Sequence, residues 1–265
     1  MNVKLVVTDM DGTFLNDGGT FDKSSFNLLK DEMLSKGIEF VFCTGKQCER
    51  VEALVGDLAK DLYIIGDSAT KIKHNNEILY KATVSNTLGQ KIIKNITRID
   101  LNQTIIACTE KSAYVLRNLD EDELKIVYGS YHHVTLIDSF DEISEDFLKI
   151  TVHDPDQNCK ETAKQLVEMY ENVYIVASEE SWIDITKKNV NKGTTINYIQ
   201  KELGISVDET IAFGDGLNDI DLFSAAKFKV AMDNAYPELK QKANLIAKNN
   251  NENGVVRTLQ LLLNS

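Results

Sequence analysis

The stretch KLVVTDMDGT (residues 4–13) decides the fold and raises the main chemical question. An apolar run ends in Asp9, and Asp11 follows two residues later. Side chains two residues apart on an extended strand point to the same face, about 6–7 Å apart. Two ionised carboxylates this close repel each other. A bound cation, or a proton kept by one carboxyl, removes that conflict, and both solutions suit catalysis.

Gly12 and Thr13 complete the motif. Gly12 permits a backbone turn that a side chain would hinder, and Thr13 offers a hydroxyl that can fix a carboxylate. An alternative interpretation is an Asx-turn and helix cap, which is the commoner origin of an isolated DGT sequence. That alternative does not explain Asp9, which directly ends the apolar run.

Outward from this stretch, short β-branched runs alternate with helical patterns. Strands are expected at 4–9, 38–44 and 62–67, with helices between them, and the alternation returns from Lys192 to a closing helix near the end of the chain. Strand–helix–strand order predicts a parallel sheet with right-handed crossovers. The expected fold class is α/β, with a Rossmann-like parallel-sheet core and helices on both faces.

The middle of the chain has a different pattern. KIKHNNEILY (71–80) predicts a hairpin, and further short strands and hairpins alternate with amphipathic helices up to SWIDIT (181–186). Hairpins mixed with helices are typical of an α+β module. We therefore expect a core formed by residues 1–82 and 187–265, split by an inserted α+β cap at 83–186.

Composition excludes several classes of function. The formal net charge is -12, and no basic run offsets it, so neither a nucleic-acid nor a membrane-surface partner is expected. The four cysteines show no metal-ligand spacing, and Cys43 is expected to be a buried free thiol, as in a reducing cytosol. No signal peptide or membrane span is indicated, so we expect a cytoplasmic protein of undetermined oligomeric state.

Two further segments are expected to end strands at the same edge of the sheet, where ligands bind in open parallel sheets. CTGK (43–46) combines the Thr44 hydroxyl, the Gly45 amide and a helix N-terminus into a possible anion cradle; simple N-capping by Thr44 is the alternative. GDGLND (214–219) places Asp215 between two glycines, where it can bind Mg²⁺. A simple turn is the alternative for GDG, but a position between a strand and a helix weakens it.

Lys192 opens a predicted helix in the stretch NKGTTI. A cation at a helix N-terminus opposes the macrodipole, which costs some tenths of a kcal/mol, so this position calls for an anionic partner. The alternative is an exposed lysine that tolerates the small cost. The sequence alone leaves the two interpretations even.

Together these segments resemble the haloacid dehalogenase-like phosphohydrolases, specifically the large-cap Cof-type subgroup. The similarity covers the whole chain: DMDGT near the start, CTGK on the second strand, an inserted cap, KG at 192–193, and then GDGLND and VAMDNA (230–235). Lys46 stands where the family commonly has arginine, DSA (67–69) stands where it often has NGA, and Leu222 replaces a usual methionine. Lysine provides a point charge where arginine provides a bidentate fork, so the role of Lys46 is open.

The resemblance implies a role for each site residue. Asp9 would attack phosphorus and form an aspartyl-phosphate, and Asp11 would act as general acid and then as general base. The remaining roles follow the family pattern: Mg²⁺ bound by Asp9, Asp215 and the backbone carbonyl of Asp11; the phosphoryl group bound by Thr44, Gly45, Lys192 and Asn218; and supporting positions at Asp219 and Thr13.

Charge counting agrees with this assignment. The carboxylates of Asp9, Asp11, Asp215 and Asp219 outweigh Mg²⁺ and Lys192 by one charge. A phosphate dianion then binds unfavourably unless one carboxyl is protonated, which matches an acid role for Asp11.

The resemblance further implies a Mg²⁺-dependent phosphatase for small phosphorylated metabolites, often sugar phosphates. A phosphomutase, and a ligand-sensing protein that has lost turnover, remain as alternatives; the intact set of acidic residues and lysine weighs against the second. Substrate specificity is expected to lie in the cap, which carries no recognisable signature. His132 and His133 are expected in a polar loop and Trp182 in the core of the cap.

Overall fold

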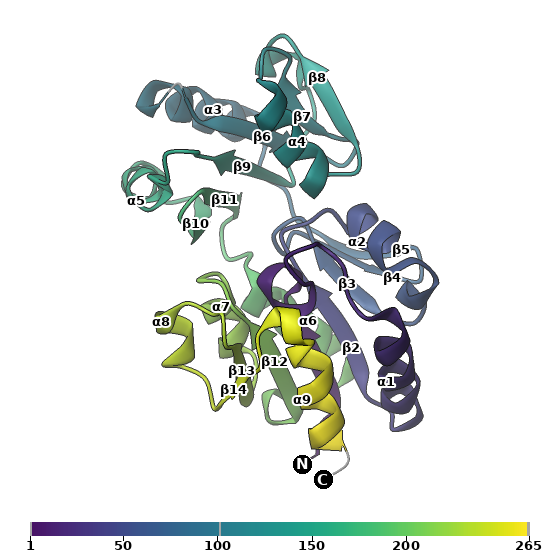
Figure 1. The fold of residues 1–265 in the computed structure, drawn as a ribbon. Coiled ribbons are helices and arrows are strands. Elements are labelled where there is room, and N and C mark those ends of the chain that lie inside the picture. The colour runs from purple at the N-terminus through teal and green to yellow at the C-terminus, as the bar shows by residue number, and fades with distance from the viewer. Residues whose placement is uncertain (1, 101, 264–265) are drawn as a thin grey trace.

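The computed structural model describes residues 2–100 and 102–263, which form a larger core and a smaller cap (Figure 1). Eight strands among these residues build the core sheet in the order β14-β13-β12-β1-β2-β3-β4-β5. Their bounds are β1 Leu5–Thr8, β2 Glu39–Cys43, β3 Tyr63–Gly66, β4 Lys71–His74, β5 Glu77–Lys81, β12 Thr210–Gly214, β13 Phe228–Met232 and β14 Leu245–Ala247.

The core sheet is parallel from β14 to β3, and β4 and β5 add the antiparallel hairpin expected at 71–80. The helix α9 packs beside α1, and α6 packs beside α7 (Figure 1). The helices of the core are α1 Lys23–Ser35, α2 Cys48–Val55, α6 Lys192–Leu203, α7 Asp219–Ser224, α8 Pro237–Lys240 and α9 Gly254–Leu263.

Strand β1 lies at the point where the strand order reverses. It pairs in parallel with β2 on one side and with β12 on the other, so that Thr8 is level with Phe42 and with Phe213. The chain runs outward from β1 in one direction through β2 and β3, and in the other through β13 and β14. Ligands bind at such a switch point, beyond the carboxyl ends of the strands.

Aromatic packing holds the turn that follows β1. A short helical turn spans Met10–Phe14, and Gly12 within it has a φ of 68°, a left-handed conformation that glycine adopts without strain. The Phe14 ring lies 4.9 Å from the rings of Phe26 and Phe42, centroid to centroid. These edge-to-face contacts are favourable beyond the area that they bury, and they anchor the turn against α1 and β2.

The cap is a six-stranded sheet with the strand order β10-β11-β9-β6-β7-β8, counted over the described residues. Its strands are β6 Thr104–Cys108, β7 Ala113–Leu116, β8 Val134–Ile137, β9 Lys149–His153, β10 Val173–Glu179 and β11 Trp182–Lys187. Its helices are α3 Asn86–Ile99, α4 Glu121–Ser130 and α5 Cys159–Met169. The mixed α/β core with an α+β cap confirms the expected fold class, whereas the boundaries at 83 and 186 stay a prediction.

Several local expectations need correction. The helix α4 was not expected from the sequence, although Asp120 accepts a hydrogen bond from the Glu123 amide as its N-cap. Because α4 supplies a crossover, β8 pairs with β7 in parallel. The edge strand β14 was also missed.

All four cysteines are buried and free, which confirms the expectation for Cys43. No helix in the described ranges is long and apolar enough to cross a membrane.

Candidate active site

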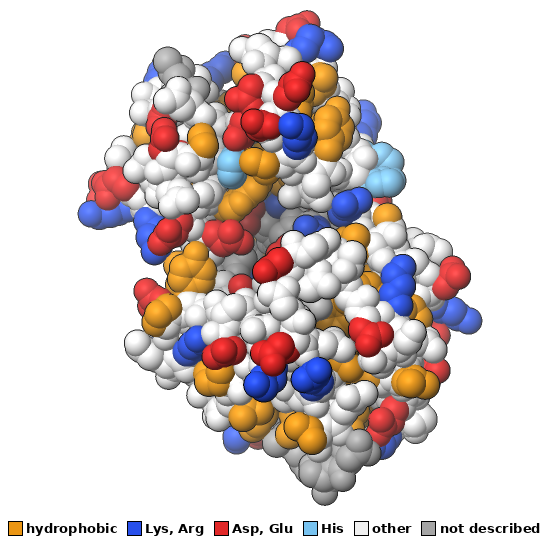
Figure 2. Space-filling model, viewed as in Figure 1, with side chains coloured by type: hydrophobic (Ala, Val, Ile, Leu, Met, Phe, Trp, Pro, Cys, Tyr) orange, Lys and Arg blue, Asp and Glu red, His pale blue; other side chains and the backbone are white. Residues whose placement is uncertain are grey.

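A cavity of about 300 Å³ opens between the core and the cap, at the carboxyl ends of the parallel strands. The space-filling view shows the hollow between the two parts (Figure 2). The core contributes Asp9, Asp11, Thr44, Gly45, Lys46, Asp215, Gly216 and Asn218 to its wall, and the cap contributes Ser130, Tyr131, Lys149, Thr151, Ser178, Glu179, Trp182 and Asp184. The three core segments singled out in the sequence therefore converge on one site.

Asp9 occupies the centre of the core side. Its backbone amide donates to the carbonyl of Phe213 at 3.1 Å, which extends the pairing of β1 with β12 by one residue. Its carboxyl is 7% exposed and accepts a hydrogen bond from the Lys192 ammonium at 2.7 Å. Lys192 thus has the anionic partner that its position at the start of α6 requires.

Asp219 holds Lys192 and the loop after β12 in place. One carboxylate oxygen accepts from the Lys192 ammonium at 2.7 Å. The other oxygen accepts from the backbone amides of Asp215 and Gly216 at 3.0 and 2.9 Å. Because both oxygens already have donors, this geometry suits a residue that orients Lys192, which is the supporting position expected for Asp219.

Asp215 faces Asp9 from the loop after β12. Its Oδ1 accepts from the Thr13 hydroxyl at 2.5 Å, so Thr13 does fix a carboxylate. A Cβ at Gly12 would collide with the Asp215 carboxylate, which explains why glycine stands between the two motif residues Asp11 and Thr13. The turn after β1 and the loop after β12 are packed together at this point.

Burial, with the neighbouring carboxylates adding to it, raises the pKa of two of these carboxyls. Burial raises the pKa of Asp9 well above its usual range; Lys192 opposes the shift, and the carboxylates of Asp219 and Asp215 add to it. Burial, with the neighbouring Asp219, raises the pKa of Asp215 to about 7. Burial alone would lower the pKa of Lys192, but Asp219 and Asp9 outweigh it, so Lys192 stays charged.

The same crowding of carboxylates identifies the place for a metal ion. Oxygens of Asp9, Asp215 and Asp219 lie within 4.8 Å of one another. A hard divalent cation such as Mg²⁺ prefers oxygen ligands and would neutralise the mutual repulsion of these carboxylates. The residues present therefore fit Mg²⁺. Asp219 joins the expected ligands in this cluster, whereas the side chain of Asp11 does not.

Asp11 and Lys46 form an ion pair that sequence reasoning missed. The Lys46 ammonium lies 2.9 Å from the Asp11 carboxylate, whose side chain is 51% exposed. Asp11 lines the cavity but is not part of the cluster formed by Asp9, Asp215 and Asp219. The lysine that departs from the family pattern adds a positive charge beside the expected general acid.

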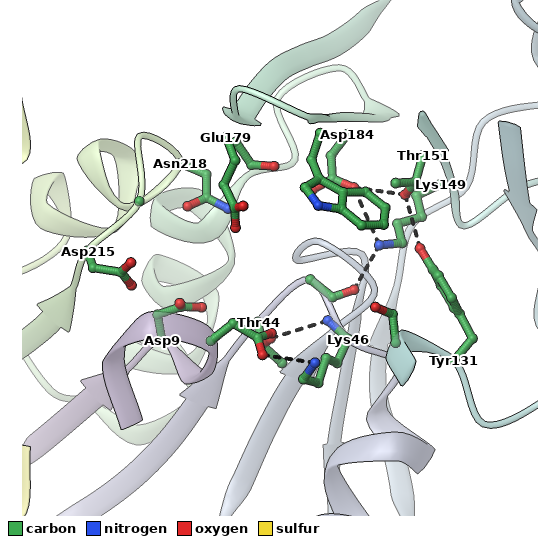
Figure 3. Close-up of a pocket in the computed structure, with 16 residues that line it drawn as sticks. Asp9, Thr44, Lys46, Tyr131, Lys149, Thr151, Glu179, Asp184, Asp215 and Asn218 are labelled. Atoms are coloured by element: carbon green, nitrogen blue, oxygen red, sulfur yellow. Dashed lines mark hydrogen bonds and ion pairs between the residues drawn. The ribbon is translucent and has the colours of Figure 1, made fainter. Parts of the chain in front are cut away.

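The CTGK segment lines the core side of the cavity, and Figure 3 shows Thr44 next to Asp9. The Thr44 hydroxyl accepts a hydrogen bond from the Lys46 amide at 3.2 Å, and Gly45 follows Thr44 along the cavity wall. Asn218 lines the cavity from the start of α7. Every residue expected to bind phosphate therefore lies in or beside this cavity; their binding roles stay predictions.

The cap residues that reach the cavity could not be recognised in the sequence. Trp182, expected in the core of the cap, packs at the edge of a small cap cluster and also lines the cavity. His132 and His133 lie in an exposed loop, as expected, and their backbone amides donate to the Gln47 side chain at 2.9 and 3.3 Å. Side chains from separate cap strands meet here only through tertiary folding.

Comparisons with known proteins agree with this architecture. The family model for haloacid dehalogenase-like hydrolases matches residues 6–259. The 5-amino-6-(5-phospho-D-ribitylamino)uracil phosphatase YbjI of Escherichia coli is 28% identical, over 99% of this chain and 97% of that protein.

Solved structures give the same result. The protein SMU.1108c of Streptococcus mutans superimposes with a TM-score of 0.95 at 28% identity, over 99% of this chain and all of the other. A haloacid dehalogenase subclass IIB sugar phosphatase shares the fold, with a TM-score of 0.81 at 22% identity, over 98% of this chain and 99% of its own. The chain belongs to the haloacid dehalogenase-like hydrolase family.

Proposed function

We propose that this protein is a Mg²⁺-dependent phosphatase that hydrolyses monophosphate esters of small, hydroxyl-rich metabolites such as sugar phosphates. The observation that carries the proposal is the grouping of Asp9, Asp215 and Lys192 at the switch point of the sheet, beside a cavity between the core and the cap. A protein that only bound its ligand would need no buried nucleophile beside a metal site.

The proposed reaction has two steps. The Asp9 carboxylate attacks phosphorus, the bond from phosphorus to the leaving oxygen breaks, and Asp11 gives its proton to that oxygen. Asp11 then takes a proton from water, which attacks the aspartyl-phosphate, releases inorganic phosphate and restores Asp9. When bound, Mg²⁺ supplies positive charge beside the phosphoryl oxygens.

Lys192, the Thr44 hydroxyl and the Gly45 amide are the proposed partners of the phosphoryl oxygens. A loose phosphoryl-transfer transition state needs alignment and charge neutralisation more than covalent chemistry. Lys192 is held by Asp219 before any substrate arrives, so its charge is in place without reorganisation.

The cap side of the cavity supports a neutral, hydroxyl-rich leaving group. The Glu179 carboxylate lines the cavity and accepts no hydrogen bond from a described residue, so it can accept from a substrate hydroxyl. The Trp182 ring offers an apolar face beside it. The relative from Escherichia coli is named for a substrate with a phosphorylated ribityl chain, which belongs to this chemical class.

The test is hydrolysis of p-nitrophenyl phosphate and of a panel of sugar phosphates, with and without Mg²⁺. We expect Mg²⁺-dependent release of phosphate, and a fall of at least about 10⁴-fold in Asp9→Asn, because the amide cannot act as nucleophile. Asp208→Asn is the matched control, since Asp208 forms an exposed ion pair with Lys227 far from the cavity.

Three outcomes would contradict the proposal. Undiminished hydrolysis in excess chelator would exclude the metal-dependent mechanism, and equal rates for the wild type and Asp9→Asn would favour a binding protein with a contaminating activity. Isomerised sugar phosphate in place of free phosphate would identify a phosphomutase.

A further inference from the structure

Lys149, on the cap strand β9, is a buried cation that contacts the core. The side chain of Lys149 is 3% exposed, and its ammonium lies 2.8 Å from the carbonyl oxygen of Gly45 and 3.1 Å from the hydroxyl of Ser68. Both of these acceptors belong to core loops. Its third partner is the carboxylate of Asp184, on the neighbouring cap strand β11, at 3.4 Å. Figure 3 shows Lys149 pointing from the cap toward this core loop.

The number of N–H donors on this lysine decides whether it can bind the substrate or only hold protein groups in position. An ammonium group has three N–H donors, and Lys149 has three acceptors within the protein: Gly45, Ser68 and Asp184. No donor is left for a substrate in this arrangement. Lys149 lines the cavity, but its contacts are those of a residue that holds other groups in position.

Other cap residues hold Lys149 in position. The Asp184 carboxylate also accepts from the Thr151 hydroxyl at 2.9 Å, and the Tyr131 hydroxyl donates to Thr151 at 3.3 Å. The Lys149 ammonium lies 5.3 Å from the centre of the Tyr131 ring. Burial alone would lower the pKa of Lys149, but Asp184 and the other surrounding groups outweigh it, so the charge persists. The ammonium is thus anchored on the cap side before it meets the core.

The contact with Gly45 constrains the Gly45–Lys46 peptide, which directly follows the Gly45 N–H proposed to bind phosphate. The Gly45–Lys46 peptide is planar, so holding its carbonyl also fixes its N–H. That N–H, of Lys46, donates to the Thr44 hydroxyl at 3.2 Å. The Lys46 side chain then pairs with Asp11. Gly45 has no side chain to restrict its own backbone, so the contact with Lys149 adds a restraint that the loop itself lacks at the Gly45 carbonyl.

We propose that Lys149 is a positioning residue: with the cap closed, it fixes the Gly45–Lys46 peptide, and through it the Thr44 hydroxyl and the pair of Lys46 with Asp11. Movement of the cap away from the core withdraws the ammonium and releases the peptide. Closure of the cap over a substrate therefore completes the phosphate site as well as covering it. This inference rests on the proposed phosphatase function of the same cavity.

The variants are chosen so that the buried Asp184 carboxylate is never left without the Lys149 ammonium; in Asp184→Asn the ammonium keeps its neutral acceptors, the Gly45 carbonyl and the Ser68 hydroxyl. Lys149→Met alone strands the Asp184 carboxylate, which can prevent folding. The informative pair is therefore Asp184→Asn and the double variant Lys149→Met with Asp184→Asn. The two proteins differ only in the ammonium, and the neutral amide at position 184 remains in both.

Steady-state kinetics with a sugar phosphate is the first measurement. Relative to Asp184→Asn, we expect the double variant to lose about 100-fold in kcat, as for a group misplaced by about 1 Å, while KM changes by less than about threefold. A rise in KM at unchanged kcat would mean that Lys149 binds the leaving group directly, and unchanged values of both would mean that it does nothing for the reaction; either result overturns the proposal.

Hydrogen exchange gives a readout that needs no turnover. In the double variant the Lys46 amide should exchange at least about tenfold faster than in Asp184→Asn, because the Gly45–Lys46 peptide has lost its contact with the ammonium. The exchange rates of amides in β13 should stay unchanged. Equal exchange of the Lys46 amide in two folded proteins would overturn the proposal. If the wild type shows no phosphatase turnover, the proposed function fails, and the exchange result still decides the role of Lys149.

Discussion

At the scale of single residues, Asp67 shows how burial changes an ionisable group outside the acidic cluster. Its side chain is 1% exposed and makes no well-formed hydrogen bond among the described residues; the Lys71 ammonium lies 4.0 Å away. Burial raises its pKa to about 6, against the opposing effect of Lys71 and Lys149. Its φ of 53° lies in the left-handed region, which asparagine tolerates well.

We therefore predict that Asp67→Asn stabilises the protein increasingly as the pH rises. The folded-state pKa lies above the unfolded value, so the stability that the protonated carboxyl contributes is present below about pH 4 and is lost as the pH rises through about 6. A shift of this size corresponds to about 3 kcal/mol between the two limits. The melting temperature of Asp67→Asn minus that of the wild type should be higher at pH 8 than at pH 4.5.

Lys71 keeps its contact with Glu49, at 2.8 Å, in the Asp67→Asn variant, so the variant leaves no cation without a partner. A difference in melting temperature that stays constant across this pH range would show that Asp67 titrates normally. Asp61→Asn is a suitable control, since Asp61 also has a positive φ, of 62°, and is only half-buried.

At the scale of elements, the short turn after β1 depends on one glycine for two separate reasons. Gly12 and Gly19 have nearly equal φ values, 68° and 69°. A Cβ at Gly12 would collide with the Asp215 carboxylate, whereas nothing lies within 4 Å of a Cβ at Gly19. Alanine at either position introduces left-handed strain of about 1–2 kcal/mol, but only alanine at position 12 displaces an acidic side chain from the cavity.

We predict that Gly12→Ala lowers kcat/KM by about 100-fold or more, since it moves Asp215 by a distance of the order of 1 Å. It should also abolish the rise in melting temperature that we expect on addition of Mg²⁺. Gly19→Ala should lose a similar amount of stability and keep both properties. If both variants lose activity to the same extent, backbone strain and not the displacement of Asp215 is the cause.

The element most difficult to predict was α4. Its sequence, EDELKIVYGS, buries only Val127, so it lacks the broad apolar face by which an amphipathic helix is recognised. The signal that could have revealed α4 is its N-cap residue. Asp120 precedes a first turn that contains three acidic residues, which favours a helix N-terminus. Because α4 connects β7 to β8, the parallel pairing of these two strands could not be predicted without it.

At the scale of the whole molecule, acidic residues are in excess, and acidic side chains also line the cavity. The formal net charge is -12. Within the cavity, Glu179 adds a carboxylate on the cap side, and burial, together with Asp11 and Asp184, raises its pKa. The cap cation Lys149 is engaged by protein groups. The described cap residues thus leave no free cation in the wall to receive a second anionic group on the substrate.

We predict that a sugar bisphosphate is hydrolysed with a kcat/KM about tenfold below that of the matching monophosphate, because repulsion from Glu179 costs about 1.4 kcal/mol. Glu179→Gln should reduce the gap to within about threefold. Glu180→Gln is the matched control, since Glu180 pairs with Lys160 and is not part of the cavity wall. A bisphosphate hydrolysed as fast as the monophosphate by the wild type would exclude this account of selectivity.

The sequence alone determined the core fold and the core half of the site. Alternation of apolar runs and helices identifies a parallel sheet, and polar residues directly after Thr8, Cys43 and Gly214 must then meet at one edge, because parallel strands place their carboxyl ends together. Local rules were sufficient because each of these side chains is positioned by the strand that it follows.

Only the tertiary structure decided the cap half. Lys149, Asp184 and Tyr131 come from β9, from β11 and from the loop after α4, and no spacing in the sequence relates them. The contact of Lys149 with Gly45 depends on how the cap packs against the core. That packing is determined by many contacts between the two parts. The pairing of Lys46 with Asp11 is decided in the same way, since a flexible lysine has many possible partners until the fold leaves one within reach.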